Sequence, residues 1–156
     1  MGQRPSFSMS RMSTASRILL IGSLLYFIDL FLAWQHACVG LATLGNFCVS
    51  QSGWHGIGII NGILAILILV MEIIVLANVE VNVGTPSMRN MVEAGLAGGL
   101  LVFTIIKILA DHSHLYIWAW IGIVLAVVVA YGGYMRWQEA SVSTPPPSPP
   151  GGGFAP

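Results

Sequence analysis

The stretch "IGIINGILAILILVMEIIVLA", residues 57–77, decides the fold class of this chain. A helix that crosses a bilayer needs about 20 consecutive, mostly apolar residues. This run supplies them and holds one charged side chain, Glu72. Strands of membrane barrels are shorter and alternate polar with apolar residues, which this run does not do. The stretch therefore predicts a membrane-spanning helix.

Three further apolar runs of similar length flank it, at residues 18–34, 91–110 and 115–135. Hydrophobic residues make up 56% of the chain and charged residues only 8%, whereas a soluble domain carries about 25% charged residues. The chain therefore lacks the side chains for a polar shell. We expect an all-α fold, a four-transmembrane-helix bundle over residues 18–136.

Three segments lie outside the four predicted spans. We expect residues 1–17 to form a cytosolic tail and residues 35–56 to form an outer loop. Residues 137–156 end in "STPPPSPPGGGFAP", a composition that favours extended and coil conformations over a packed element. This last segment is therefore predicted to be a disordered cytosolic tail rich in Pro and Gly.

Basic residues predict the orientation, because cytoplasmic loops of membrane proteins carry an excess of Lys and Arg. With four spans, five arginines fall on one side of the membrane: Arg4, Arg11, Arg17, Arg89 and Arg136. We therefore expect a multi-pass protein of the bacterial inner membrane, with both termini in the cytoplasm.

Both cysteines of the chain, Cys38 and Cys48, lie in the predicted outer loop. Cysteine pairs on the oxidising side of a membrane usually form disulfides. A thiol–disulfide relay is the alternative, but such relays need a Cys-x-x-Cys motif or a second pair, and the chain has neither. The sequence favours a structural disulfide.

Charged residues inside the spans are candidate functional residues, because they are costly in a bilayer. Asp29 and Lys107 lie at similar depth near the outer ends of the first and third spans, so we expect an intramembrane charge pair. The pair is either a structural clamp or part of a proton or cation path. Asp29 and the deeper Glu72 are the candidate proton sites, and Glu93 is expected at the inner interface.

All four histidines are predicted on the outer side: His36, His55, His112 and His114. Imidazole is a common ligand of zinc and copper, so a metal site formed by these residues is one hypothesis. Histidine is also ordinary at a membrane interface. We expect no cofactor.

Two small-residue motifs are placed for close helix packing, Gly58-x-x-x-Gly62 and Gly95-x-x-x-Gly99. Glycines four residues apart lie on one helix face and let two backbones approach. The motifs support tight bundling or oligomerisation without choosing between them.

Two short motifs carry a resemblance, "FLAW" at residues 31–34 and "SGWHGIG" at residues 52–58. They resemble small four-helix membrane proteins, frequent in actinobacteria, that have a Phe-Leu-Pro-Trp end to the first helix and a Gly-Trp-x-Gly start to the second. Ala33 stands where that pattern has Pro. The family has no firm biochemical assignment, so the resemblance implies a fold and no catalytic residues.

The sequence contains no catalytic or nucleotide-binding motif, and its net charge of zero gives no footprint for nucleic acid. We expect a non-enzymatic accessory or scaffold subunit of a larger membrane complex, with the lipid bilayer and other membrane subunits as partners. A homo-oligomer is left open. The alternatives are a small homo-oligomeric proton-coupled transporter or channel, and a membrane redox or metal-binding protein.

Overall fold

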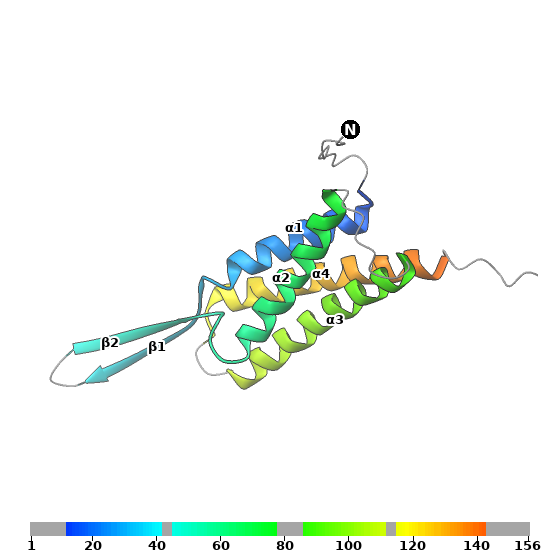
Figure 1. Ribbon diagram of the computed structural model, residues 1–156. Helices are drawn as coiled ribbons and strands as arrows, with labels where there is room; N and C mark the ends of the chain where they lie inside the picture. The colour runs from blue at the N-terminus through cyan, green and yellow to red at the C-terminus, as the bar shows by residue number, and fades with distance from the viewer. Residues whose placement is uncertain (1–11, 42–44, 78–85, 112–114, 143–156) are drawn as a thin grey trace, which may run out of the picture.

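The computed structural model describes residues 12–41, 45–77, 86–111 and 115–142 (Figure 1). Within these ranges the chain forms four helices and one two-stranded hairpin. The elements follow one another as α1 (Thr14–Asp29), β1 (Ala33–Leu41), β2 (Gly45–Ser52), α2 (Gly58–Leu76), α3 (Pro86–Ala110) and α4 (Ile117–Val142).

Three helices are long and apolar enough to cross a membrane. The qualifying segments are Gly58–Leu76, Ser87–Ala110 and Ile117–Val142, with mean hydropathies of 2.9, 1.9 and 1.9. The prediction of a helical membrane protein is confirmed for these three runs.

The first apolar run forms a shorter helix than predicted. The sequence indicated a span over residues 18–34, but α1 covers Thr14–Asp29, about 24 Å at 1.5 Å per residue. The Ser13 hydroxyl accepts a hydrogen bond from the Ser16 amide at 3.3 Å and so starts the helix one turn early. The predicted extension to Trp34 is wrong, because the chain leaves the helix at Leu30 and Trp34 folds back into the bundle.

Two other predicted boundaries also change. The segment at residues 35–56, predicted as an outer loop, contains most of an antiparallel hairpin in which Cys38 lies opposite Cys48. α4 continues to Val142, into the segment predicted as a disordered tail. The remaining parts of the predicted tails, residues 1–11 and 143–156, lie outside the described residues.

The four helices form one bundle, and the hairpin projects from one end of it (Figure 1). Each helix packs against its neighbours in sequence, and α4 closes the ring by packing against α1. The start of α1 and the end of α4 lie at the end of the bundle opposite the hairpin.

The surface of the bundle differs from that of a soluble protein. Large apolar side chains face outward on every helix, for example Ile21, Ile63, Val102 and Val124. The interior holds an apolar core together with polar side chains, and the polar ones that are at most 5% exposed are Ser16, Ser23, Asp29, Asn61, Glu72, Glu93, Thr104, Lys107 and Arg136. An apolar exterior with the charged side chains turned inward is the arrangement expected in lipid.

The predicted glycine motifs contribute unequally to packing. A Cβ atom on Gly62 would lie 2.2 Å from the Trp54 ring, and one on Gly58 would overlap the Gly53 carbonyl, so both glycines make room for the turn before α2. Gly95 has no atom within 4 Å of its Cβ position, and Gly99 makes one ordinary contact. The close approach of α3 to α4 occurs instead at Gly133.

Gly133→Ala should destabilise the bundle, because the new Cβ atom would lie 2.5 Å from the Ala97 Cβ and 3.3 Å from the Ala94 backbone. We expect a loss of about 1–3 kcal/mol in the free energy of unfolding, measured by thermal unfolding in a mild detergent. Gly95→Ala is the matched control and should be neutral or slightly stabilising, because its site is open and Ala favours helix. Equal effects of the two substitutions would contradict this packing.

Candidate functional site

A buried charge cluster joins all four helices near the end of the bundle opposite the hairpin. Arg136 of α4 is at its centre and is 5% exposed. Its Nη2 lies 3.2 Å from Oε1 of Glu72 on α2, and its Nε lies 3.0 Å from Oε2 of Glu93 on α3. Both carboxylates are fully buried. Nη2 also donates a hydrogen bond to the Ser16 hydroxyl on α1.

Two more charged side chains border this cluster. Glu139 accepts a hydrogen bond from Nη1 of Arg136 at 3.3 Å and reaches solvent with 39% of its side chain exposed. Arg89 approaches Glu93 at 3.8 Å from one turn earlier on α3. A buried carboxylate needs such partners, since its desolvation in an apolar interior costs several kcal/mol. The cluster therefore fixes the depth and rotation of the helices that supply it.

Three members of this cluster, Glu72, Glu93 and Arg136, already drew attention in the sequence. Glu93 was expected at the inner interface, which stays a prediction; the structure places it two turns after the start of α3 at Pro86, buried between the helices. Glu72 is paired with Arg136, and its role as a proton site stays a prediction. Arg136 was used to predict orientation and was one of three arginines, with Arg17 and Arg89, that could reach Glu72. Arg136 follows Val129 and Gly133 at helical spacing, so all three lie on one face of α4. This spacing could have indicated from the sequence that Arg136 is buried.

The expected pair between Asp29 and Lys107 is not formed, and each side chain has different surroundings. The Lys107 ammonium donates to the His55 carbonyl oxygen at 2.8 Å and to Asp111 Oδ2 at 3.0 Å. The Trp34 ring occupies the space between the two predicted partners. Its indole N–H donates to the Asp29 backbone oxygen at 3.0 Å, and Lys107 Nζ lies 5.8 Å from its ring centroid. Similar depth in the membrane therefore does not bring the two charges together.

The Asp29 carboxyl group has no hydrogen-bond partner for either oxygen among the described residues. It is 3% exposed and packs beside Gly122 of α4, where a Cβ atom would lie 2.8 Å from Oδ2. A buried carboxyl group without a partner is unusual. Asp29 thus stays a candidate proton site.

A third polar group lies between these two regions. The Tyr26 hydroxyl and Thr104 Oγ1 are 2.7 Å apart, and the Asn61 amide donates to Thr104 at 3.4 Å. Along α2, the apolar Ala65 and Ile68 separate Asn61 from Glu72, a rise of about 16 Å. The polar groups therefore do not form one continuous path through the bundle.

The base of the hairpin is held firmly in the bundle. Trp34 is 1% exposed, packs edge-on against Tyr26 at 6.3 Å and fills the space left by Gly122. The Tyr116 amide, just before α4, donates to the Trp34 carbonyl oxygen at 2.8 Å, and Gln35 forms a β-bridge with Leu115. The first strand therefore starts from a fixed position.

The predicted disulfide is confirmed. Cys38 of β1 and Cys48 of β2 are directly opposite in the register, with Cα atoms 4.0 Å apart, and their sulfur atoms are bonded. Both residues are exposed. The disulfide closes the hairpin across its middle, so the strands cannot separate beyond it.

The histidines do not gather into a metal site within the part of the chain that the structure describes. The His36 ring packs 4.8 Å from the Tyr116 ring, and His55 uses its backbone carbonyl to bind Lys107. No group of three His, Cys, Asp or Glu side chains suited to a metal occurs among the described residues. His112 and His114 lie outside them.

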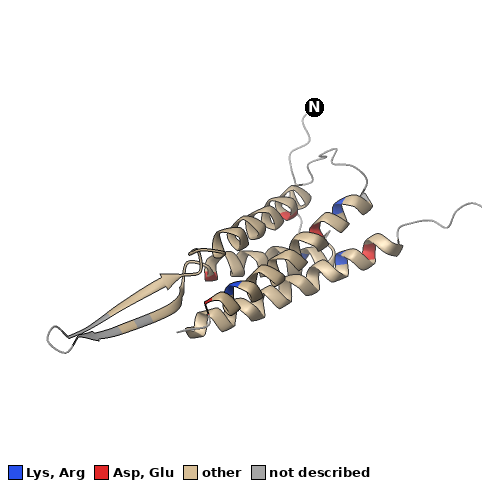
Figure 2. Cartoon of the chain, turned by 90° about the horizontal axis from the view of Figure 1, so that it is seen from below, with Lys and Arg blue, Asp and Glu red and all other residues tan. Residues whose placement is uncertain are grey.

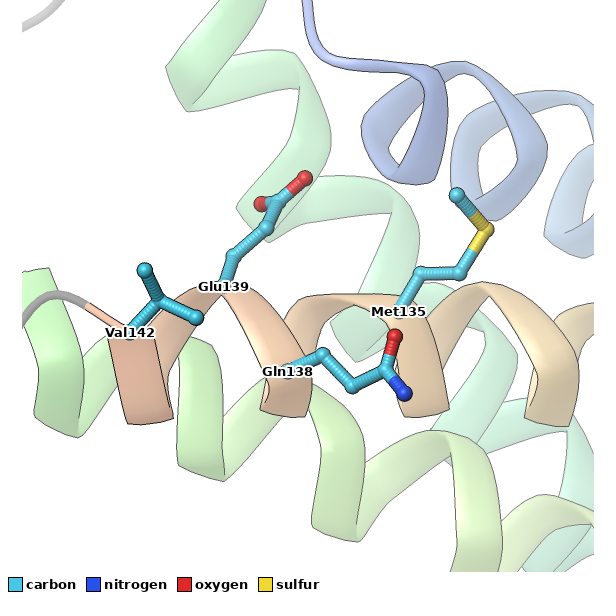
Figure 3. A pocket seen from close by; sticks show the side chains of 4 residues that line it. All are labelled: Met135, Gln138, Glu139 and Val142. Atoms are coloured by element: carbon cyan, nitrogen blue, oxygen red, sulfur yellow. The ribbon is translucent and has the colours of Figure 1, made fainter.

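A shallow depression of about 470 Å³ lies on the last turns of α4, lined by Met135, Gln138, Glu139 and Val142 (Figure 3). All four lining residues come from one helix, and Glu139 already pairs with Arg136. The depression therefore belongs to the edge of the charge cluster.

Comparisons with known proteins return no match: no family model, no curated protein and no solved structure matches the chain. The resemblance of "FLAW" and "SGWHGIG" to small actinobacterial membrane proteins stays a prediction.

Arg136→Met should strongly destabilise the bundle, because it leaves Glu72 and Glu93 buried without their partner. We expect a loss of about 3–5 kcal/mol in the free energy of unfolding, measured by thermal unfolding in detergent. Glu139→Gln, at the exposed edge, should cost much less. Adding Glu72→Gln and Glu93→Gln to Arg136→Met should restore most of the lost stability, and failure to do so would contradict the ion-pair role.

Reduction of the disulfide should loosen the hairpin and leave the bundle intact. The cross-link contributes about 3 kcal/mol in the loop-entropy description, so amide exchange in β1 and β2 should accelerate by roughly a hundredfold. The thermal unfolding of the helices should not change, because the base of the hairpin is anchored by Trp34. The Cys38→Ser, Cys48→Ser double variant should behave in the same way. A lower unfolding temperature of the bundle would contradict this separation.

Proposed function

We propose that this chain is a non-enzymatic accessory subunit of a larger membrane protein complex, and that its hairpin is the element that meets the other subunits. The observation that carries the proposal is the disulfide-closed hairpin, which has no Asp, Glu, Lys or Arg and projects from the bundle (Figure 2). The four helices pack against one another without the projecting part of the hairpin, so that part is available to contact another protein. The anchor at Trp34 and the disulfide hold the hairpin ready for a partner, and such preorganisation lowers the entropic cost of association.

The interior of the bundle supports this proposal in a second way. Its two best-defined polar groups are used internally: Arg136 binds two carboxylates, and Tyr26, Asn61 and Thr104 bind one another. Side chains engaged in this way hold helices in register and are poorly placed to bind a substrate.

The orientation is part of the proposal. We propose the bacterial inner membrane as the location, with both termini in the cytoplasm and the hairpin on the outer face. Arg17 near the start of α1, Arg89 in the first turn of α3 and Arg136 near the end of α4 support this orientation, because basic residues favour the cytoplasmic side. An outer location also agrees with a disulfide, which forms on the oxidising side.

A small proton-coupled transporter is the second candidate, and one observation favours it. Asp29 is a buried carboxyl group without a partner among the described residues, and membrane carboxyl groups of this kind are typical of proton-coupled sites.

Gentle extraction from native membranes followed by native mass spectrometry tests the proposal. We expect the chain in a particle with one or more different membrane subunits in a fixed ratio. A particle that contains only this chain would contradict the proposal. The particle that contains only this chain would then be reconstituted into proteoliposomes. Dissipation of a pH gradient that Asp29→Asn abolishes would favour the proton-coupled transporter over the accessory subunit.

A further inference from the structure

The buried part of the charge cluster has more acidic groups than basic ones. Glu72 of α2 and Glu93 of α3 are 0% exposed, and Arg136 is the one buried guanidinium beside them among the described residues. α1 contributes the neutral Ser16 hydroxyl, and the adjacent Arg17 is exposed. With both carboxyl groups ionised, the interior would hold two negative charges against one positive charge. An uncompensated charge in an apolar interior is so costly that the group becomes neutral instead.

The partly exposed members of the cluster do not remove this excess. On α3, Nε of Arg89 lies 3.8 Å from Oε1 of Glu93, which is too far for a hydrogen bond, and the Arg89 side chain is 34% exposed. On α4, Glu139 accepts a hydrogen bond from Arg136, and its side chain is 39% exposed. These two partly solvated charges have opposite signs, so they offset each other at the rim. The buried excess of one negative charge therefore remains.

The two buried carboxyl groups also lack hydrogen-bond donors. Three of their four oxygens accept no hydrogen bond from a described residue, namely Oε2 of Glu72 and both oxygens of Glu93. The fourth, Oε1 of Glu72, accepts from Nη2 of Arg136 at 3.2 Å. Nε of Arg136 lies 3.0 Å from Oε2 of Glu93 but is not aligned to donate to it. A proton on one carboxyl group would supply a donor that the cluster lacks.

Arg136 brings the two carboxyl groups to one site. Nε and Nη2 are neighbouring donors on the same edge of the guanidinium, and such an edge can bind both oxygens of a single carboxylate. Here Glu93 lies at Nε and Glu72 lies at Nη2, so two carboxyl groups divide that edge. Two carboxyl groups that share a site do not both ionise, because their like charges repel each other.

We propose that Glu72 and Glu93 form a proton-binding site, in which the two carboxyl groups share one proton beside Arg136. The proton comes from solution and forms an O–H bond on one carboxyl group, and no other bond changes. One carboxylate then pairs with one guanidinium, and the buried cluster is neutral. The partly exposed Glu139, which is hydrogen-bonded to Arg136, connects the site to solution. This site goes beyond the role proposed for the hairpin and does not depend on it.

Infrared spectroscopy of the purified chain in lipid vesicles at neutral pH tests the proposal, because protonated and ionised carboxyl groups absorb at different frequencies. We expect Glu72→Gln and Glu93→Gln each to lose the same protonated-carboxyl band relative to the wild type. Either substitution leaves one carboxyl group with one guanidinium, so the remaining carboxyl group ionises. The buried Asp29 is present in all three proteins and cancels in the difference spectra. Glu139→Gln is the matched control and should lose no such band.

Two results of the infrared experiment would overturn the proposal. Loss of the band in only one of the two variants would mean that one carboxyl group is protonated independently of the other. Loss of no band in either variant would mean that both carboxyl groups are ionised and that something other than a proton compensates their charge.

The pH dependence of unfolding in mixed detergent micelles provides a second test. A folded state that holds one proton more than the unfolded chain loses stability as pH rises. From weakly acidic to weakly alkaline pH, we expect the unfolding equilibrium constant of the wild type to increase by about tenfold per pH unit more than that of either Gln variant. Equal pH dependence in all three proteins would overturn the proposal. A wild type whose stability does not fall as pH rises would overturn it without reference to any variant.

Discussion

The guanidinium of Arg136 is the group on which the rest of the bundle depends. It meets a carboxylate from α2, a carboxylate from α3 and a hydroxyl from α1. Because an unpaired carboxylate is so costly in an apolar interior, each helix has one depth and one rotation that satisfies its polar residue. Close packing follows from this constraint, since Gly133, one turn before Arg136, lets α3 approach α4. The outward-facing side chains take no part in this constraint and need only be apolar enough to lie in lipid.

Those features of the fold that depend on local sequence were predictable. Length and hydropathy of a run are local properties, and they identified three membrane helices. The pairing of Cys38 with Cys48 was also predictable, because the chain has no other cysteine and the segment lies between two long apolar runs. The strands around the cysteines were missed. Gly40 and Gly45 interrupt the alternation of apolar and polar residues that would predict strands there. The hairpin is recognised only from the antiparallel register of β1 and β2 in the structure.

The contacts of the charged residues were not predictable, because they depend on how each helix is rotated. Asp29 and Lys107 have similar depths, yet the Trp34 ring lies between them and Lys107 binds Asp111 instead. Depth along a helix is readable from sequence, but the face that meets a given neighbour is set by tertiary packing. The same reason explains Arg136, which appeared to be a flanking cation and is the centre of the buried cluster.

The position of Arg136 in the chain has a consequence for how the protein is made. Glu72 precedes it by 64 residues, and Glu93 lies on the helix before it. During synthesis, α2 and α3 leave the ribosome before the residue that neutralises their carboxylates. Until α4 is present, Glu72 and Glu93 lack the guanidinium that pairs with both of them, so the first three helices cannot complete the buried charge cluster. A chain cut short before α4 would keep both carboxylates and lose their shared partner, so the last helix completes the charge balance of the whole bundle.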